Sequence, residues 1–146
     1  MPALPWSRVS PAEPGAELTV MGSRLPLRSY RHIPGFMKWT LRIRSQLEHA
    51  EGLVGYSLDA HLLKKTFWTV SAWTSQAALD EFVRQNPHGA GMVAIRPHMQ
   101  KSGFVFWTAT PEDLPVDWDD VRRRISEKAE RKHDGSGRSN PTPSPE

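Results

Sequence analysis

Short apolar runs alternate with segments of helical periodicity through the middle of the chain. Residues 17–27 are rich in apolar and β-branched residues, but Gly22 and Pro26 interrupt them. This pattern is typical of an edge-like strand with a bulge or an early end. From Pro34, a proline suited to a first helical turn, apolar residues recur at helical spacing as far as Gly52. We therefore expect an amphipathic helix that ends at a glycine.

Three further strands and a second helical region follow. The strand-like runs lie at residues 53–62, 66–73 and 104–109. Between the last two runs, Thr74 and Ser75 supply an N-cap for a helix. Asn86 and Pro87 form a second cap, so the helix is expected to break and to restart at His88.

The order strand, helix, strand, strand, helix, strand predicts a ferredoxin-like α+β domain, in which an antiparallel sheet carries its helices on one face. Nine of the 13 prolines lie outside residues 17–110, whereas four of the six tryptophans lie inside. The large apolar side chains therefore concentrate in the central segment. The expected units are a flexible Pro-rich arm at 1–16, the domain at 17–112, a C-terminal helix at 113–132 and a disordered tail at 133–146.

Both faces of the predicted sheet are apolar. The run 66–73 places Phe67 and Trp73 on one face and Trp68 and Val70 on the other. The last strand likewise alternates Phe104 and Phe106 with Val105 and Trp107. Helices cover one face only, so the other face needs a second cover. A second copy of the sheet is the simplest cover and predicts a homodimer, and the alternative is that the terminal arms fold back over this face.

The composition excludes several classes of function. The chain has no cysteine, which excludes a disulfide scaffold, a thiolate metal site and a cysteine nucleophile. The net charge of +3 is spread over the chain without a reading motif, so no nucleic-acid partner is expected. No run of 18 apolar residues and no secretory h-region occur, so we expect a cytoplasmic protein without a membrane span.

His88 is the most distinctive candidate for chemistry. Its place in the first turn of a helix disfavours the imidazolium and keeps a nitrogen lone pair available for a metal or for proton transfer. Gly89 and Gly91 beside it would let a flat ligand or another backbone approach closely. The alternative is a structural histidine with glycines that serve tight helix packing. The sequence has no Gly-x-Ser-x-Gly motif, no phosphate loop and no paired-histidine metal motif.

The segments 66–73, 78–82 and 87–92, with Ile95 and Arg96 beyond, resemble the dimeric α+β-barrel superfamily of antibiotic-biosynthesis monooxygenases. A tryptophan that ends a strand, an aromatic residue in the next helix and a histidine soon after are most similar to its spheroidene-monooxygenase-like branch and to related uncharacterised bacterial domains. The resemblance implies a ferredoxin-like protomer, a homodimer and a monooxygenase that oxidises a hydrophobic organic substrate, polyketide-like or isoprenoid-like. The alternative is a non-catalytic dimeric protein of the same fold that binds haem or another small ligand.

The resemblance also bears on the cofactor, because some members of the superfamily work without one and others bind haem. His88 lies where a helix histidine ligates the iron in the haem-degrading members, but residues 18–25 hold no asparagine and the preceding helix has Phe82 in place of a tryptophan. Haem degradation is therefore not expected, whereas haem binding stays open and no other cofactor is expected. The expected catalytic residues are His88 and Trp73. The expected cofactor-binding residues are His88, Phe82 and Trp107, with His88 as the metal ligand.

Overall fold

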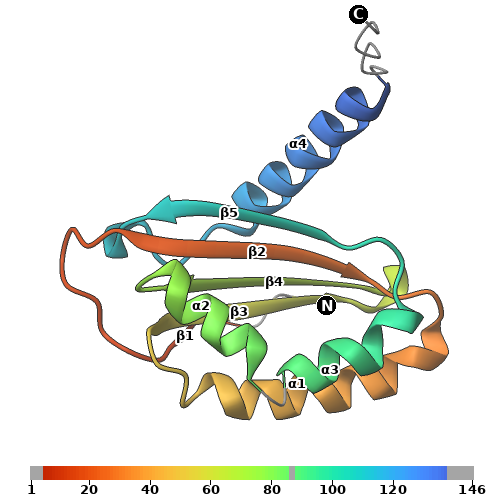
Figure 1. The fold of residues 1–146 in the computed structure, drawn as a ribbon, viewed down its shortest axis with the longest axis horizontal. Coiled ribbons are helices and arrows are strands. Elements are labelled where there is room, and N and C mark those ends of the chain that lie inside the picture. The colour runs from red at the N-terminus through yellow and green to blue at the C-terminus, as the bar shows by residue number, and fades with distance from the viewer. Residues whose placement is uncertain (1–4, 86–87, 138–146) are drawn as a thin grey trace, which may run out of the picture.

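The computed structural model describes residues 5–85 and 88–137. Figure 1 shows a twisted sheet with helices packed on one face and a long C-terminal helix that leaves the other face and projects away from it. The strands are β1 (Ser7–Arg8), β2 (Leu18–Pro26), β3 (Leu53–His61), β4 (Thr66–Trp73) and β5 (Gly103–Ala109). The helices are α1 (Ile33–Leu47), α2 (Gln76–Arg84), α3 (His88–Ile95) and α4 (Trp118–Gly137).

The sheet is antiparallel throughout, and its strand order is β1-β3-β4-β2-β5. The predicted ferredoxin-like α+β fold is confirmed. The prediction that 17–27 forms an edge strand is wrong, because β2 pairs with β4 on one side and with β5 on the other. Gly22 has a packing role here: a Cβ at this position would lie 2.9 Å from a methyl group of Val121 in α4. The glycine therefore makes room for α4 rather than ending the strand.

The predicted helix boundaries are largely confirmed. The Ser75 hydroxyl caps α2 by accepting a hydrogen bond from the Ala78 backbone N–H at 3.1 Å. The second cap predicted at Asn86 and Pro87 lies outside the described residues, and α3 begins at His88 as expected. Gly52 does not end α1, which stops at Leu47; it adopts a positive φ of 81° in the turn that leads into β3.

The expectation of two apolar sheet faces is confirmed. On the face covered by α1, α2 and α3, which we call the helix side, two clusters of buried residues form the core, namely Leu27, Phe36, Phe67, Ile95 and Met99, and Leu53, Trp73, Leu79 and Phe82. On the opposite face, which we call the α4 side, one cluster joins the sheet to α4: Leu18, Val20, Val54, Val70, Ala72, Val105, Val121 and Ile125.

The chain's own ends cover the α4 side. The N-terminal segment, expected to be a flexible arm, contributes β1, and Trp6 packs over Gly55 of β3. From the other end, Val121 and Ile125 of α4 are buried against the sheet. In the single chain this cover is therefore the one given above as the alternative, in which the terminal segments fold back over the sheet. The homodimer stays a prediction, but an uncovered sheet face no longer supports it.

The helix expected at 113–132 begins later, at Trp118, and runs on to Gly137, into the segment expected to be a disordered tail. The rest of that tail lies outside the described residues. Among the residues that the structure describes, no helix is long and apolar enough to cross a membrane.

Candidate functional site

Two rows of paired residues run across the helix side of the sheet, from β4 through β2 to β5. Thr69 pairs with Ser23, and Ser23 pairs with Phe104. Ser71 pairs with Met21 in the next row, and Met21 pairs with Phe106. Because directly paired residues of an antiparallel sheet point to the same face, each row carries an aromatic ring at the β5 edge and a hydroxyl group at the β4 end. The first row has a second hydroxyl, that of Ser23, at its centre, whereas the centre of the second row is Met21.

The hydroxyl groups of these rows are held in place by hydrogen bonds. Ser23, which is buried, shares a hydrogen bond with the Thr69 hydroxyl. Ser71 is also buried and accepts a hydrogen bond from the indole N–H of Trp73 at 2.8 Å. We call Ser23, Thr69 and Ser71 the hydroxyl floor. A buried hydroxyl that already has a partner keeps a further lone pair or proton, but a ligand reaches Ser23 or Ser71 only when the side chains that cover them move.

The rings of three predicted site residues lie one beside the next, close to this floor, and we call them the aromatic row. The ring of Trp73, at the end of β4, lies 5.2 Å from that of Phe82 in α2, and the ring of Phe82 lies 5.3 Å from that of His88 in α3. Trp73 is only 1% exposed and Phe82 only 6% exposed. Both rings therefore pack beneath the site and do not contact a ligand directly, because a ligand cannot reach a buried ring without moving the side chains that cover it.

His88 joins α2, α3 and α1 at one point. Its ring nitrogen Nδ1 lies 3.2 Å from the Val83 carbonyl oxygen, one of the C-terminal carbonyls of α2, and its backbone N–H donates to the Gln46 side chain of α1 at 2.9 Å. Burial lowers the pKa of His88, and the hydrogen bond to Val83 opposes this in part. A neutral imidazole that donates from Nδ1 carries its lone pair on Nε2. Burial, rather than the helix dipole, is thus the main reason why this imidazole stays neutral.

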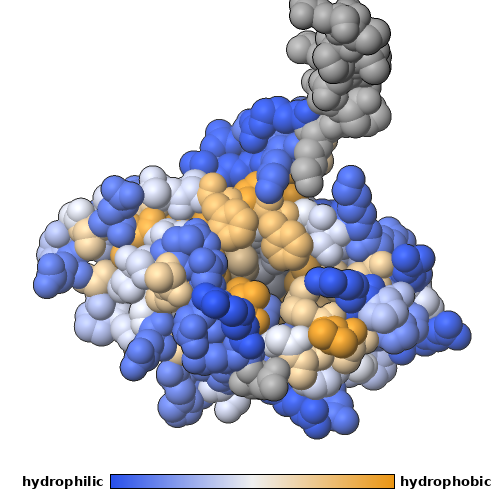
Figure 2. Space-filling view, viewed as in Figure 1, coloured by the Kyte–Doolittle hydropathy of each residue, from blue (hydrophilic) through white to orange (hydrophobic). Residues whose placement is uncertain are grey.

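An open cleft adjoins the β5 end of the first row, at Phe104. Its volume is about 420 Å³, and its lining includes Met92 of α3 and Phe104 of β5, with Arg28, Arg96 and Lys101 at its polar edge. Figure 2 shows apolar side chains gathered at the centre of this face, where β2 and β5 pass above the gap between α2 and α3.

Two residues away from Phe104, Phe106 is 51% exposed, although it is a large aromatic residue. Its cross-strand partner Met21 packs against the cluster that contains Trp73 and Phe82. The exposed apolar surface of β5 thus continues into the buried aromatic row. Exposed aromatic side chains beside a cleft are typical of a ligand-binding surface.

Trp107, the remaining predicted site residue, lies on the other side of the sheet. It packs in the α4-side cluster, and the Arg124 guanidinium lies 4.6 Å from the centre of its ring. Trp107 and Phe82 therefore cannot line one pocket, because the sheet separates them. Gly91 serves helix packing: a Cβ there would lie 3.1 Å from the Trp39 ring of α1. The space beside Gly91, which was expected to admit a flat ligand or another backbone, is occupied by α1.

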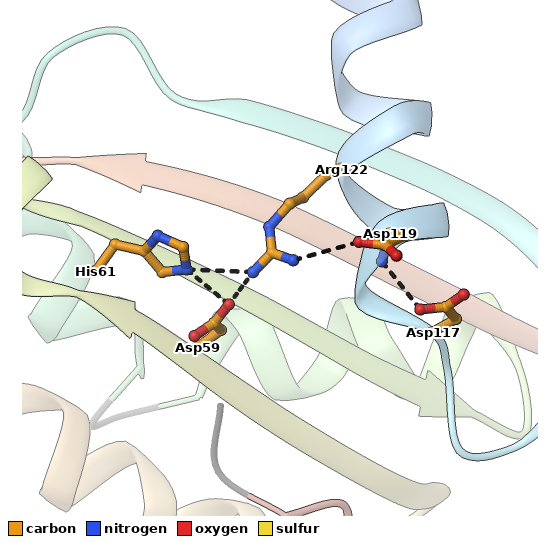
Figure 3. A network of polar contacts seen from close by, with 5 residues as sticks. All are labelled: Asp59, His61, Asp117, Asp119 and Arg122. Atoms are coloured by element: carbon orange, nitrogen blue, oxygen red, sulfur yellow. Dashed lines mark hydrogen bonds and ion pairs between the residues drawn. The ribbon is translucent and has the colours of Figure 1, made fainter. Parts of the chain in front are cut away.

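The α4 side carries the main buried charge of the described residues. Arg122 of α4 forms an ion pair with Asp59 of β3, and His61 Nε2 lies 2.8 Å from the same carboxylate oxygen (Figure 3). The other oxygen of Asp59 is buried and has no hydrogen-bond partner within the described part of the chain. The Arg122 guanidinium also lies 5.4 Å from the Trp68 ring centre and 5.6 Å from that of Trp118. These contacts fix α4 to the sheet.

Sequence reasoning missed the hydroxyl floor, although a signal for it was present. In β4, Thr69 and Ser71 share a face with Phe67 and Trp73. Two polar residues between two buried aromatic residues on one face are unusual for a core. The strand period alone therefore marks these positions, but only the pairing with β2 brings Ser23 beside them.

No model of a protein family matches the chain, and no curated protein matches it in sequence. Solved structures match its fold. SnoaB, a cofactor-independent oxygenase from Streptomyces nogalater, is 18% identical and has a TM-score of 0.54, with 68% of this chain and 99% of SnoaB covered. An antibiotic biosynthesis monooxygenase is also 18% identical, with a TM-score of 0.57 and coverage of 64% and 99%. A conserved protein from Methanosarcina mazei is 11% identical, with a TM-score of 0.57 and coverage of 63% and 92%. The fold is that of the antibiotic-biosynthesis monooxygenases, as the resemblance implied.

The expectation of haem is wrong. SnoaB, which shares the fold, is a cofactor-independent oxygenase. The residues expected to hold haem are also not arranged around one space, since Trp107 lies across the sheet from His88 and Phe82. The ring of His88 is in contact with Phe82 and its Nδ1 lies against a carbonyl of α2. Within the side chains that the structure describes, at residues 5–85 and 88–131, no group of three histidine, aspartate or glutamate residues could hold a metal ion.

Proposed function

We propose that this protein is a monooxygenase that oxidises a hydrophobic, electron-rich organic substrate of polyketide type in the cleft beside β5. The observation that carries the proposal is that half-buried Phe104 and exposed Phe106 lie at the β5 ends of two adjacent rows that also contain the buried hydroxyl groups of Ser23 and Ser71. A flat substrate would lie against Phe104 and Phe106, and the hydroxyl floor would orient its oxygen atoms. The fold shared with SnoaB, an oxygenase, supports this choice among possible small-molecule reactions.

The proposed reaction draws its electrons from the substrate. A base removes a proton from an activated CH₂ group, and the resulting carbanion adds O₂ to give a hydroperoxide anion, which takes a proton back. Loss of water from the hydroperoxide then leaves a C=O group, so that CH₂ and O₂ become C=O and H₂O. The protein's part is to bind the substrate, to accept and return one proton and to exclude competing water.

We propose His88 as the base. Its lowered pKa keeps the imidazole neutral near pH 7, and its hydrogen bond to Val83 leaves the lone pair on Nε2. Trp73 is proposed as a positioning residue rather than a catalytic one, because it is buried and donates to Ser71. Loss of the Trp73 indole N–H would therefore act through the hydroxyl floor.

Oxygen uptake with anthrone tests the proposal, since anthrone is a flat tricyclic ketone with an activated CH₂ group. The protein, with no metal or cofactor added, is expected to accelerate oxygen consumption and to give one anthraquinone for each O₂ consumed. Heat-unfolded protein at the same concentration gives the background rate. Equal rates for folded and unfolded protein would contradict the proposal. If anthraquinone binds while oxygen uptake stays at background, the protein is a ligand-binding member of this fold instead.

A further inference from the structure

A second cavity lies on the opposite side of α3 from the β5 cleft, between α1 and the end of α3. Its volume is about 220 Å³. The buried side chains Leu27, Phe36 and Ile95 line it together with Trp39. This interior is apolar and includes two aromatic rings, so it suits a small flat hydrocarbon group.

Basic residues alone supply the charged lining of this cavity. Arg31, His32 and His98 line it, and the rings of the two histidines are stacked with their centres 4.1 Å apart. Of the described residues that line the cavity, none is acidic. Burial lowers the pKa of His32, and His98 and Arg31 lower it further. His32 is therefore a neutral N–H donor near pH 7, and Arg31 is the fixed positive charge.

The chain segments that supply the lining are also free of acidic residues. Residues 18–47 and 82–111, which supply every residue that lines the cavity, contain nine lysines and arginines and no aspartate or glutamate. An apolar interior with a basic, acid-free rim is complementary to a small aromatic group that carries one negative charge.

We propose that this cavity is a binding site for a small aromatic monocarboxylate. The aromatic group occupies the space between Phe36 and Ile95, and the carboxylate accepts hydrogen bonds from Arg31 and from the stacked histidines. The site is separate from the β5 cleft and does not depend on the oxygenase reaction.

Gly35 offers a direct way to close the site. It lies in the lining of the cavity, and a Cβ at this position would meet no atom within 4 Å. A larger side chain at position 35 therefore enters free space without moving the backbone. Glycine also weakens a helix relative to other residues, so Gly35→Leu is expected to fold. Ala94, which lines the cavity from α3 and is exposed, offers a second blocking variant, Ala94→Leu.

The test is a titration of the full chain with 2-naphthoate and, as the neutral probe of matched shape, 2-naphthamide, followed by NMR of the tryptophan indole N–H signals. We expect 2-naphthoate to bind with a dissociation constant of about 1 mM or tighter. The Trp39 signal should shift while the Trp73 signal stays in place. The amide should bind about fivefold more weakly, because it lacks the charge that pairs with Arg31.

Variants separate charge from shape. Arg31→Gln should remove the preference for the carboxylate. Arg44→Gln, which removes the same charge from an exposed position near the C-terminal end of α1, should retain it. Gly35→Leu and Ala94→Leu should each weaken binding of both probes by about tenfold or more. Equal affinity of the wild type for the two probes would overturn the proposal. So would a titration in which the folded blocking variants bind as tightly as the wild type, or in which Trp39 does not respond.

Discussion

On the α4 side of the sheet, Val20, Val70 and Val121 are at most 1% exposed, whereas on the helix side Phe106 is 51% exposed. The same sheet thus has one sealed face and one face with an opening at the β5 edge. The sealed face holds a buried ion pair that fixes α4, and the open face holds hydroxyl groups between aromatic rings. We infer that the α4 side maintains the fold and that the helix side binds ligands, because an exposed aromatic surface adds little to stability.

The largest expected effect is the loss of stability caused by a charged residue at Val121, on the sealed α4 side. Val121→Asp places a carboxylate against Gly22, Val105 and Trp107 with no charged partner. We expect a loss of about 5 kcal/mol in the free energy of unfolding, together with release of α4. Urea denaturation and limited proteolysis measure both changes. Ala129→Asp, in the exposed outer part of the same helix, is the control and should change stability little.

The next effect concerns the ion pair. Arg122→Ala leaves Asp59 as a buried carboxylate without its cation, which is expected to cost about 3 kcal/mol. This is the lower end for a buried pair, because Arg122 keeps 30% of its side-chain exposure. Adding Asp59→Asn should recover much of the loss, as followed by urea denaturation. Arg123→Ala removes an exposed ion pair to Asp120 and should have almost no effect. Equal losses from Arg122→Ala and Arg123→Ala would show that the Asp59 contact does not hold α4.

Two neighbouring residues of β5, Phe106 and Trp107, point to opposite faces of the sheet and test how the two faces differ in stability and activity. Phe106→Ala should lower stability by about 1 kcal/mol or less, whereas Trp107→Ala should cost about 3 kcal/mol. For activity the order should reverse: Phe106→Ala lowers kcat/KM for anthrone oxidation by about tenfold, and Trp107→Ala leaves it nearly unchanged while the protein is folded. Thermal melts and oxygen uptake on the same samples check both. If Trp107→Ala impaired activity more than Phe106→Ala did, the ligand site would lie on the α4 side and not on the helix side.

The smallest expected effect is the contribution of His88, on the helix side, to the pH dependence of stability. Burial lowers the pKa of His88 below its ordinary value of 6.5, so the unfolded chain binds this proton more tightly than the folded chain does. Its contribution is complete above pH 6.5 and is lost as pH falls through the folded pKa. His88→Gln, which can still donate to Val83, should show a weaker loss of stability between pH 7 and pH 5. Identical pH profiles of denaturation would contradict this cause.

Much of the fold could be predicted because strand period and helix caps are local signals. Thr66 and Trp73 bound β4 as predicted, and Ser75 caps α2. The position of β2 could not be predicted in this way, because the reason for Gly22 is its contact with Val121, about 100 residues later. The effect of a distant helix on one backbone position leaves no local pattern.

The candidate site was predicted in part for a similar reason. Trp73, Phe82 and His88 were expected to form one site, and they lie in one row. Trp107 is also predicted to lie in this pocket, but it lies on the opposite face of the sheet. Alternation tells which residues of a strand share a face, but it does not tell which face of β5 is the helix side. That choice depends on the whole sheet.

Ligands are expected to bind on the helix side of β5 and not on the α4 side. Methyl NMR of protein labelled at methionine and valine, titrated with anthraquinone, tests this directly. We expect shifts of the Met21 and Met92 methyl signals, while those of Val20 and Val70 stay in place. Shifts confined to Val20, Val70 and Val121 would contradict it.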